Sequence, residues 1–505
     1  MSARNVVLVE VNEVPNSVLD AYARQSPFMA DFLAGADRYT TICADQIQLD
    51  PWIAWPTFHR GVPDTVHGLL RLGQDTAQID ENYPPVWRTL KDQGVSVGVC
   101  GSLFSSSEED LADYSFMVPD VFSPHANVNP DSLQRFQSFN LAMTRASARN
   151  ASEGVAAGGG AAVADLALHG WLRPQTMARV AGQLVNERLD HKKLSRRRNT
   201  QTELFGDVFC ALLEKERPQF STYYTNNVAA AMHRFWSASF RDSSINGSRL
   251  RTDWMDAYSD EVFAAMRSVE RILRRILAVM GDDTTIVLAS AIGQEEIPAE
   301  NHARFATIVD PDQFIAGLLD RAEIGAYQLL PAMVPDFTIR FDDTQDADLV
   351  CERLSAFAVG ENAAIETLER MNTKELVGAD TGRPHIRYGY DKADFKFPIT
   401  FARSDRTTVH VSLQIDDYTG PTEARLGNRA VPFPEIGLGL ISHDEGVNCT
   451  AQHCAEGSLT VRRPGGAKGA SELKVVSSVD FVPSLLKHFG VAQAPHLSGE
   501  ACIEF

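Results

Sequence analysis

Carboxylates, amides and imidazoles collect in this 505-residue chain at the points where apolar stretches end. Glu10, Asn12 and Glu13 close the first such stretch, VVLVEV, and Gln294 follows a later one, TIVLAS. Carboxylates beside imidazoles can exchange protons with a substrate, and a carboxylate can also attack as a nucleophile. These residue types therefore indicate an acid–base or nucleophilic site, on condition that the fold brings them together.

The richest single stretch is DPWIAWPTFHRGVPDTVHGLLRLG, residues 50–73. With the first strand, it supplies the four residues that we predict to be catalytic: Asp50, Thr57, His59 and Glu10. The predicted substrate-binding residues come from this stretch and from the ends of the apolar runs: Asn12, Glu13, Asn227, His67, Arg71 and Gln294.

Structural roles stay open for several of these residues. Glu10 fits a paired core charge as well as a catalytic carboxylate, because it lies on an apolar run. Asp50 precedes a proline, as turn residues do, and Thr57 could cap a helix. His67 precedes Gly68, and a histidine there is typical of a turn in which the ring bonds to the loop backbone.

The elements able to position these residues alternate along the chain. Near-continuous apolar runs at residues 5–11, 95–101, 219–226 and 286–289 predict buried parallel strands. Residues 262–280 repeat apolar side chains every three to four positions, which predicts an amphipathic helix before the last run. We therefore predict an α/β fold with a doubly wound, mostly parallel sheet.

Two long stretches interrupt this alternation. Residues 127–205 are Ala-rich with a helical pattern and predict a helical cap insertion, whereas residues 331–434 predict a second, α+β insertion. The core α/β sequence is then divided into three parts, residues 1–126, 206–330 and 435–505. Insertions in such sheets usually lie over the carboxyl ends of the strands, where ligands bind.

Charge and composition narrow the choice of partner. The net charge of −19 argues against nucleic-acid and anionic-membrane partners, since both need clustered Lys and Arg. The one basic run, residues 191–198, is short; a solvated helix end is its favoured interpretation and phosphate contact the less favoured one. Seven scattered cysteines fit reduced thiols, and the N-terminus shows no signal-peptide pattern. We expect a soluble, cytoplasmic protein without a membrane segment.

An ordered set of motifs resembles the type I phosphodiesterase/nucleotide pyrophosphatase branch of the alkaline phosphatase superfamily. Gly61-x-Pro63-x-x-x-His67-Gly68 is similar to the TGxxPxxHGI motif of that family. Further similar segments keep the family's order: VVLVEVNEV, PFMADFLAGAD, YYTNNVAAAMHRFW, TAQHCAEGSLTVRRPGGAKG and SSVDFVPSLLKHFGV. The resemblance covers the core from end to end, leaves out the two insertions, and implies the alkaline phosphatase fold.

The resemblance also implies a site that has lost most of its metal ligands. Family members use two metals about 4 Å apart, with six Asp and His ligands and a Ser or Thr nucleophile. Four of the six ligand positions hold other residues in this chain: Asn12, Ala229, Ala291 and Ile292. The two ligands that remain, His233 and His453, belong to one metal site. At most one divalent metal is therefore expected, Zn²⁺ or Mn²⁺.

The family's nucleophile position falls on Pro51, beside Asp50 and six residues before Thr57. We therefore predict a phosphoric-ester hydrolase or group transferase in which Asp50 acts as nucleophile or base. The expected partner is a phosphorylated or sulfated small molecule, such as a sugar phosphate or nucleotide-sugar intermediate of surface-glycan biosynthesis.

Two alternatives stay open. One is a non-catalytic relative that binds a ligand or a partner in the old cleft. The other is a conventional two-metal phosphodiesterase whose ligands include Glu10, Glu13 and Asp50. The sequence does not predict the oligomeric state.

Overall fold

A computed structural model gives the structure of residues 5–107, 111–147, 159–247, 250–281, 283–300, 304–319, 325–330, 332, 335–366, 398–403, 405–442, 449–465 and 473–505. Its centre is an eight-stranded sheet in the following spatial order: β21 (Lys474–Ser477), β2 (Asp37–Ile42), β20 (Ser458–Arg462), β6 (Thr285–Ser290), β1 (Val6–Val11), β5 (Phe220–Thr225), β3 (Val97–Cys100) and β4 (Phe116–Val118). Only β20 runs antiparallel to its neighbours in this sheet. The predicted α/β fold with a mostly parallel sheet is confirmed.

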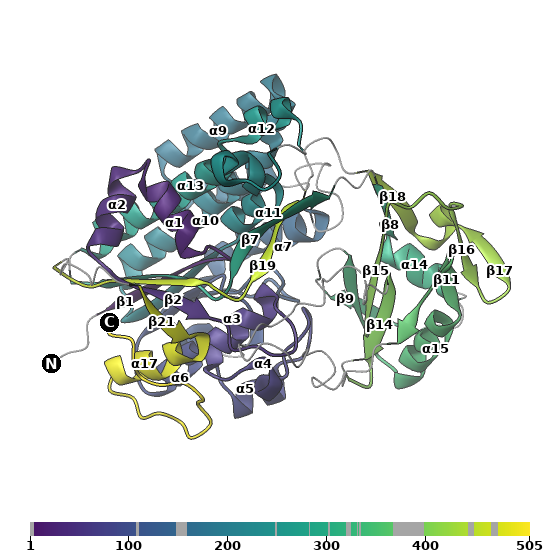
Figure 1. Cartoon of the computed structure of the whole chain (residues 1–505). Helices are drawn as coiled ribbons and strands as arrows, with labels where there is room; N and C mark the ends of the chain where they lie inside the picture. The colour runs from purple at the N-terminus through teal and green to yellow at the C-terminus, as the bar shows by residue number, and fades with distance from the viewer. Residues whose placement is uncertain are drawn as a thin grey trace, which may run out of the picture.

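Helices cover both faces of this sheet (Figure 1), as the alternation of elements requires. The helices on one face are α1 (Asn16–Ala23), α2 (Pro27–Ala34), α10 (Arg197–Glu216), α11 (Asn227–Ser239) and α13 (Glu261–Met280). Those on the other face are α3 (Pro51–Arg60), α4 (Asp64–His67), α5 (Ala77–Asn82), α6 (Val86–Asp92) and α17 (Phe481–His488). Strand β1 is buried on both sides, because Val7 and Val9 face the first layer while Val6 and Leu8 face the second.

The predicted cap region packs on the first of these layers. Its helices are α7 (Gln134–Ser147), α8 (Gly159–Leu168), α9 (Pro174–Leu189) and the short 3-10 helix η4 (His191–Arg196). Phe136, Leu166 and Trp171 join the same hydrophobic core as α10 and α13. The predicted boundary at residue 205 falls inside α10, so this helix continues from the insertion into the core layer.

A second lobe, residues 304–442, has its own hydrophobic core and lies to the right of the main body in Figure 1. Its larger sheet contains β8 (Arg304–Ile308), β9 (Tyr327–Leu330), β10 (Asp336–Phe341), β13 (Ile365–Glu366), β14 (Ile399–Arg403), β15 (Thr408–Asp416) and β18 (Leu438–Ser442). Its smaller sheet contains β11 (Phe357–Val359), β12 (Asn362–Ala363), β16 (Glu423–Leu426) and β17 (Arg429–Pro432). Helices α14 (Pro311–Leu318) and α15 (Thr344–Ser355) complete it. This lobe includes the predicted insertion and extends beyond it at both ends; residues 367–397 of the prediction lie outside the described part of the chain.

Two strands join the second lobe to the core. Strand β7 (Gly293–Glu300) leaves the core and β19 (Cys449–Cys454) returns to it, and the two pair antiparallel as a separate ribbon. Gln294 and His453 lie opposite each other in this ribbon. Gly293 permits the close passage of the returning chain, since a Cβ there would lie 2.1 Å from the carbonyl oxygen of Glu456.

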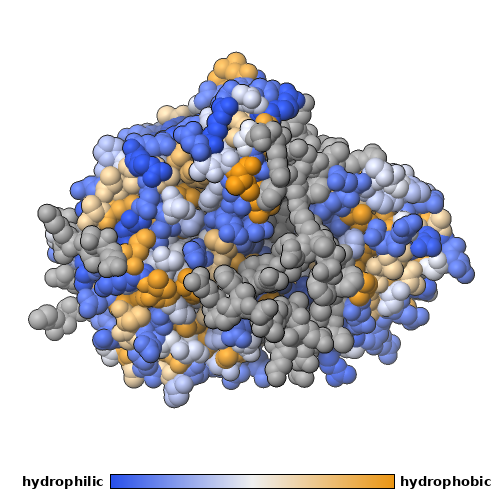
Figure 2. Space-filling model, viewed as in Figure 1, coloured by the Kyte–Doolittle hydropathy of each residue, from blue (hydrophilic) through white to orange (hydrophobic). Residues whose placement is uncertain are grey.

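Hydrophilic residues predominate on the face seen in Figure 2, and apolar residues appear there in small separate groups. In the described parts of the chain, no helix combines the length and the apolar character that a membrane crossing needs.

Candidate functional site

The site is built on the sharp turn that follows β1. Glu13 adopts φ = 62°, a left-handed conformation that is uncommon for a residue with a side chain. Hydrogen bonds fix the turn on both sides, because the Asn12 N–H donates to Thr225 O (3.0 Å) and the Val14 N–H donates to Ser290 Oγ (2.7 Å). Such strain costs of order 1–3 kcal/mol and is found mainly where the surroundings enforce it, often at functional sites.

This turn places the Glu13 carboxylate between two imidazoles. Glu13 Oε2 lies 3.0 Å from His233 Nε2 on α11 and 3.2 Å from His453 Nε2 on β19. Gln294 Nε2 donates to the same carboxylate oxygen, and Asn12 Nδ2 donates to Glu13 Oε1 (2.7 Å). The three ligand atoms lie within 4.8 Å of one another, and no other group of this kind occurs among the described residues.

Backbone carbonyls orient both imidazoles. His233 Nδ1 lies 3.0 Å from Ala451 O, and His453 Nδ1 lies 2.9 Å from Leu49 O. A carbonyl accepts hydrogen bonds only, so in each ring Nδ1 carries a proton and Nε2 points to Glu13. A backbone carbonyl that accepts from one ring N–H is a usual way to orient a metal-binding histidine, because it leaves the other nitrogen, here Nε2, for the metal.

The electrostatics of this cluster favour a charged Glu13. Burial by itself would raise the pKa of Glu13, but the nearby His453 and His233 outweigh it and hold that pKa well below its usual value. Burial would likewise lower the pKa of His453, and the charge of Glu13 raises it instead. The triad is therefore a tightly paired group, with Glu13 as an anion.

One divalent metal fits this donor set, whereas two do not. Two imidazoles and one carboxylate are the protein ligands of many catalytic zinc sites, in which a fourth position stays open. With bonds of about 2.1 Å, tetrahedral ligand atoms lie about 3.4 Å apart, close to the separations seen here. Ala291 and Ile292, at positions where the family resemblance implies ligands of a second metal, are buried apolar side chains that offer no donor atom.

Asn12, at the position where the family resemblance implies a metal-binding aspartate, is held by hydrogen bonds to neighbouring side chains. All polar atoms of the Asn12 side chain are engaged: Nδ2 donates to Glu13 and to Asn226 Oδ1 (2.8 Å), and Oδ1 accepts from Trp55 Nε1 (2.8 Å). The Asn12 amide therefore orients Glu13. Gln294, predicted to bind substrate, has a similar place, since it donates both to Glu13 and to Ala229 O.

Asp50 lies beside the cluster at the start of α3. Its Oδ1 is 3.5 Å from His453 Nδ1, and Gln48 Nε2 donates to its other oxygen. Burial raises the pKa of Asp50 to about 7, although the charge of His453 opposes this. Asp50 heads α3 without bonding a backbone N–H of that helix, so its carboxylate is not used as a cap.

Thr57 and His67 form part of a buried network away from the cluster. The Leu69 N–H donates to His67 Nδ1 (2.9 Å), so Nε2 carries the ring proton and donates to Thr57 Oγ1 (2.9 Å). The Thr57 hydroxyl then donates to Asp45 Oδ1. Neither residue is in contact with the Glu13 triad, and burial lowers the pKa of His67 to about 3, so the ring is neutral. In this geometry Thr57 and His67 hold the loop after α3, away from the triad.

Three further predicted residues are engaged elsewhere. Glu10 accepts hydrogen bonds from His59 Nε2 (2.7 Å) and Ser102 Oγ (2.8 Å), and all three side chains are almost completely buried. Asn227 bonds to Asn199, Ala265 O and Ser268 inside the helical layer. Substrate cannot reach Glu10 or His59 in this arrangement, and Asn226 rather than Asn227 faces the site.

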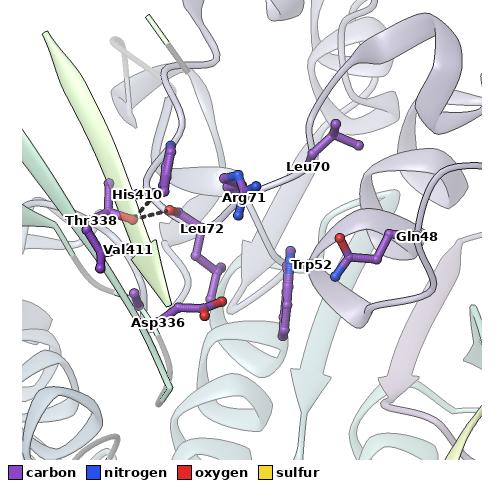
Figure 3. A pocket seen from close by; sticks show the side chains of 10 residues that line it. Gln48, Trp52, Leu70, Arg71, Leu72, Asp336, Thr338, His410 and Val411 are labelled. Carbon is purple, nitrogen blue, oxygen red and sulfur yellow. Dashed lines mark hydrogen bonds between the residues drawn. The ribbon is translucent and has the colours of Figure 1, made fainter. Parts of the chain in front are cut away.

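A pocket lies between the core and the second lobe (Figure 3), and one of its lining residues, Gln48, bonds Asp50. Gln48, Trp52 and Arg71 line it from the core, and Asp336, Thr338 and His410 line it from β10 and β15. Thr338 Oγ1 donates to Leu72 O (3.3 Å) across the two lobes and bonds His410 Nδ1 (2.8 Å). Arg71, predicted to bind substrate, has no hydrogen bond or ion pair from its guanidinium within the described residues.

The sequence model of the family "Type I phosphodiesterase / nucleotide pyrophosphatase" matches residues 56–381, more than half of the chain. This chain belongs to the type I phosphodiesterase/nucleotide pyrophosphatase family. The match includes His233, whereas Glu13, Asp50 and His453 lie outside it. No curated protein sequence matches the chain.

Solved structures similar to this family member include murine and human ectonucleotide pyrophosphatase/phosphodiesterase 5. Each is 11% identical over 98% of this chain, covers 98% and 96% of its own length respectively, and superposes with a TM-score of 0.39. An inactive variant of the murine protein in complex with AMP gives a TM-score of 0.38, at 11% identity over 98% of this chain and 97% of its own.

Proposed function

We propose that this family member cleaves or transfers phosphoric esters at a one-metal site, with Asp50 as the base. The observation that carries the proposal is the Glu13–His233–His453 triad, in which carbonyls fix both imidazoles with Nε2 toward the carboxylate. Family membership supports phosphoester chemistry, and the donor set supports one divalent cation, Zn²⁺ or Mn²⁺. Such a cation would supply Lewis-acid stabilisation of the charge on a phosphoryl oxygen.

The chain's own residues divide the remaining work. Asp50 accepts the proton of the attacking water or hydroxyl as its oxygen bonds phosphorus and the ester oxygen leaves. Gln48 holds the carboxylate of Asp50 from one side, and His453 lies on the other. The pocket with Trp52 and Arg71 receives the rest of a small phosphate or sulfate ester, because the Arg71 guanidinium, which attracts Asp336 but makes no ion pair within the described residues, offers a cation to an anionic group. A sugar phosphate or a nucleotide-sugar intermediate has the polar, charged character that this pocket suits.

Metal content is the first test. Purified protein incubated with Zn²⁺ or Mn²⁺ and passed through a desalting column should retain about one equivalent by elemental mass spectrometry. Glu13→Gln should retain almost none, because it removes the anionic member of the triad. Glu295→Gln is the matched control, since Glu295 lies on the same ribbon but is exposed, and among the described residues its side chain bonds only Gln452. Two equivalents in the wild type would overturn the one-metal site, and none would overturn the metal centre.

Activity is the second test. Wild type should release nitrophenol from bis(p-nitrophenyl) phosphate or p-nitrophenyl phosphate, and chelator should abolish the release. Asp50→Asn should keep the metal and lose roughly 10²–10⁴-fold in kcat, the usual effect of removing a general base. An Asp50→Asn enzyme with wild-type kcat would remove Asp50 from the mechanism. A metal-loaded wild type that is inert on phosphate and sulfate esters would favour the alternative, a non-catalytic ligand-binding protein.

A further inference from the structure

Strand β10 of the second lobe turns its polar face toward the core. The apolar side chains of its sequence DFTIRF belong to the lobe's own hydrophobic core: Phe337, Ile339 and Phe341. Because successive side chains of a strand point to opposite faces, Asp336 and Thr338 share the other face. That face meets the core, since the Thr338 hydroxyl donates to Leu72 O (3.3 Å). A polar strand face thus forms one wall of the pocket between the two lobes.

Strand β15 extends this polar wall. In the antiparallel ladder Ser412 lies opposite Asp336, and His410 lies opposite Thr338. The Ser412 hydroxyl donates to the Asp336 carboxylate, and His410 Nδ1 lies 2.8 Å from Thr338 Oγ1. Burial and, second, the charge of Arg71 lower the pKa of His410 to about 3, so this ring is neutral. The wall is therefore a block of polar side chains held in place by one another and by the core.

Asp336 is the member of this wall that can accept further hydrogen bonds. An ionised carboxylate has about four acceptor positions, and Ser412 occupies one of them. Arg71 attracts Asp336 but makes no ion pair within the described residues. Burial raises the pKa of Asp336 although Ser412 and Arg71 oppose it, so water solvates this carboxylate poorly. Hydrogen-bond donors of a ligand would replace the missing water.

An aromatic surface lies on the core side of the same pocket. Trp52, near the start of α3, is half-buried and lines the pocket together with Leu70 and Leu72. Figure 3 shows the Asp336 carboxylate directed toward the side of the pocket where the Trp52 ring lies. The saturated ring of a polyol has an apolar C–H face and hydroxyl groups around its edge. An aromatic plane with a carboxylate acceptor beside it matches both parts of such a ring.

The wall also lies within electrostatic reach of the proposed base. Burial is the main cause of the raised pKa of Asp50, and the negative charge of Asp336 adds to it. Gln48 joins the two places, because it lines the pocket and donates to Asp50. An ester with its phosphoryl group at the metal triad, beside Asp50, would therefore extend its remaining part toward Asp336.

We propose that Asp336 is a specificity-determining residue, which accepts hydrogen bonds from the hydroxyl groups of a ring-shaped polyol whose C–H face lies on Trp52. The second lobe thereby selects phosphoric esters of cyclic polyols over esters without hydroxyl groups. The inference rests on the proposed function for the place of the phosphoryl group, but its test needs no turnover.

Binding of two non-cleavable ligands to Zn²⁺-loaded protein tests the proposal. Glucopyranosylmethyl phosphonate and cyclohexylmethyl phosphonate both carry a saturated six-membered ring on a carbon–phosphorus bond, and only the first has hydroxyl groups. In isothermal titration calorimetry wild type should bind the glucosyl compound at least about tenfold more tightly, because a site built to bond a hydroxyl rejects an analogue that lacks it. Asp336→Ala should lose most of this preference. It should bind the cyclohexyl compound at least as well as wild type, because a negative charge near the phosphonate is gone.

Two more variants define the role of the carboxylate. Asp336→Asn should show an intermediate preference, because the amide oxygen keeps an acceptor but not the charge. Glu352→Ala is the matched control, since Glu352 is an exposed acid on α15 of the same lobe and does not line the pocket. It should keep the wild-type preference. Unchanged circular dichroism of the variants would show that the second lobe stays folded.

The outcomes separate this inference from the proposed function. Equal affinity of wild type for the two phosphonates would overturn the role of Asp336, and so would binding of neither. An Asp336→Ala variant that keeps the preference, or that binds both ligands more weakly by the same factor, would overturn it as well. A preference that depends on Asp336, in a protein that cleaves no ester, would support the inference and count against the proposed function.

Discussion

The carboxyl group of Asp45 offers a quantitative test of the network that holds the loop between β2 and α3. Asp45 is completely buried, and it accepts hydrogen bonds from Thr57 Oγ1, the Asp64 N–H (3.1 Å) and Cys43 Sγ (3.1 Å). Burial and then the charge of Asp64 raise the pKa of Asp45 from 3.8 to about 7. Because the folded state holds this proton more tightly than the unfolded state, ionisation of Asp45 opposes folding.

The sign and size of the effect follow from the linkage of proton binding to unfolding. Below about pH 4 the group is protonated in both states and costs nothing. As the pH rises from 4 to 7, only the unfolded state loses the proton, and the cost grows to about 4 kcal/mol at 1.36 kcal/mol per pKa unit. Between pH 5.5 and 8.5 the change amounts to about 2 kcal/mol.

Asp45→Asn replaces the protonated acid with a neutral group of the same shape. The stability of this variant relative to the wild type should therefore increase by about 2 kcal/mol from pH 5.5 to pH 8.5. Urea unfolding in chelator, followed by tryptophan fluorescence, measures this difference in the free energy of unfolding. The signal reports on the core that contains Asp45, because all six tryptophans lie before residue 304 and the second lobe has none. Asp75→Asn, at an exposed residue, should show no such pH dependence. An Asp45→Asn difference that is equal at both pH values would refute the argument from burial.

Two further predictions concern residues with contrasting roles. Thr57→Val should leave kcat within about twofold of wild type and destabilise the core lobe by about 1–3 kcal/mol in urea unfolding, because His67 Nε2–H and Asp45 lose their partner; a kcat loss as large as that of Asp50→Asn would show that the hydroxyl takes part in the reaction. Arg71→Gln should raise KM several-fold with kcat nearly unchanged, since it removes a contact made equally in the ground and transition states; a fall in kcat at constant KM, measured on the same ester, would place Arg71 at the reacting atoms instead.

The α/β fold could be predicted from the sequence, because it depends on the spacing of apolar residues. Apolar runs buried on both faces and helices with a 3.6-residue period lead directly to a doubly wound sheet. His233 and His453 could be recognised from motif position, and the structure brings them together across 220 residues of sequence. The prediction that a second metal site is absent depends on Ala291 and Ile292, because neither side chain can donate to a cation.

The motif pattern does not indicate Glu13 as the third member of the triad, for a physical reason. Motif alignment puts Asn12 at the family's metal position, but the left-handed turn at Glu13 carries the next side chain to the histidines. A φ of this sign at glutamate leaves no signature in composition or spacing. The same limit applies to Asn226 and Asn227, whose assignment depends on the residue at which α11 begins.

Sequence proximity to Asp50 does not place Thr57 and His59 at the cluster, because the segment after Asp50 is a helix with Pro56 inside it. A helix sends successive side chains in different directions, so residues close in sequence meet different neighbours. Asp50 reaches the cluster, Thr57 reaches Asp45, and His59 reaches Glu10. Pro56 does not distinguish a helix from a loop in the sequence, since proline is common both in loops and in the first turn of helices.

The chain enters and leaves the second lobe through one two-stranded ribbon, β7 and β19. Glu300, where the chain departs, pairs with Cys449, where it comes back, so the lobe is attached at two adjacent points. A short turn between these residues would convert the ribbon into an ordinary hairpin that still presents Gln294 and His453 to Glu13. The core that carries the triad and the outer wall of the Arg71 pocket are thus separable units, and exchange of the lobe would change the shape of that pocket while leaving Glu13, His233 and His453 in place.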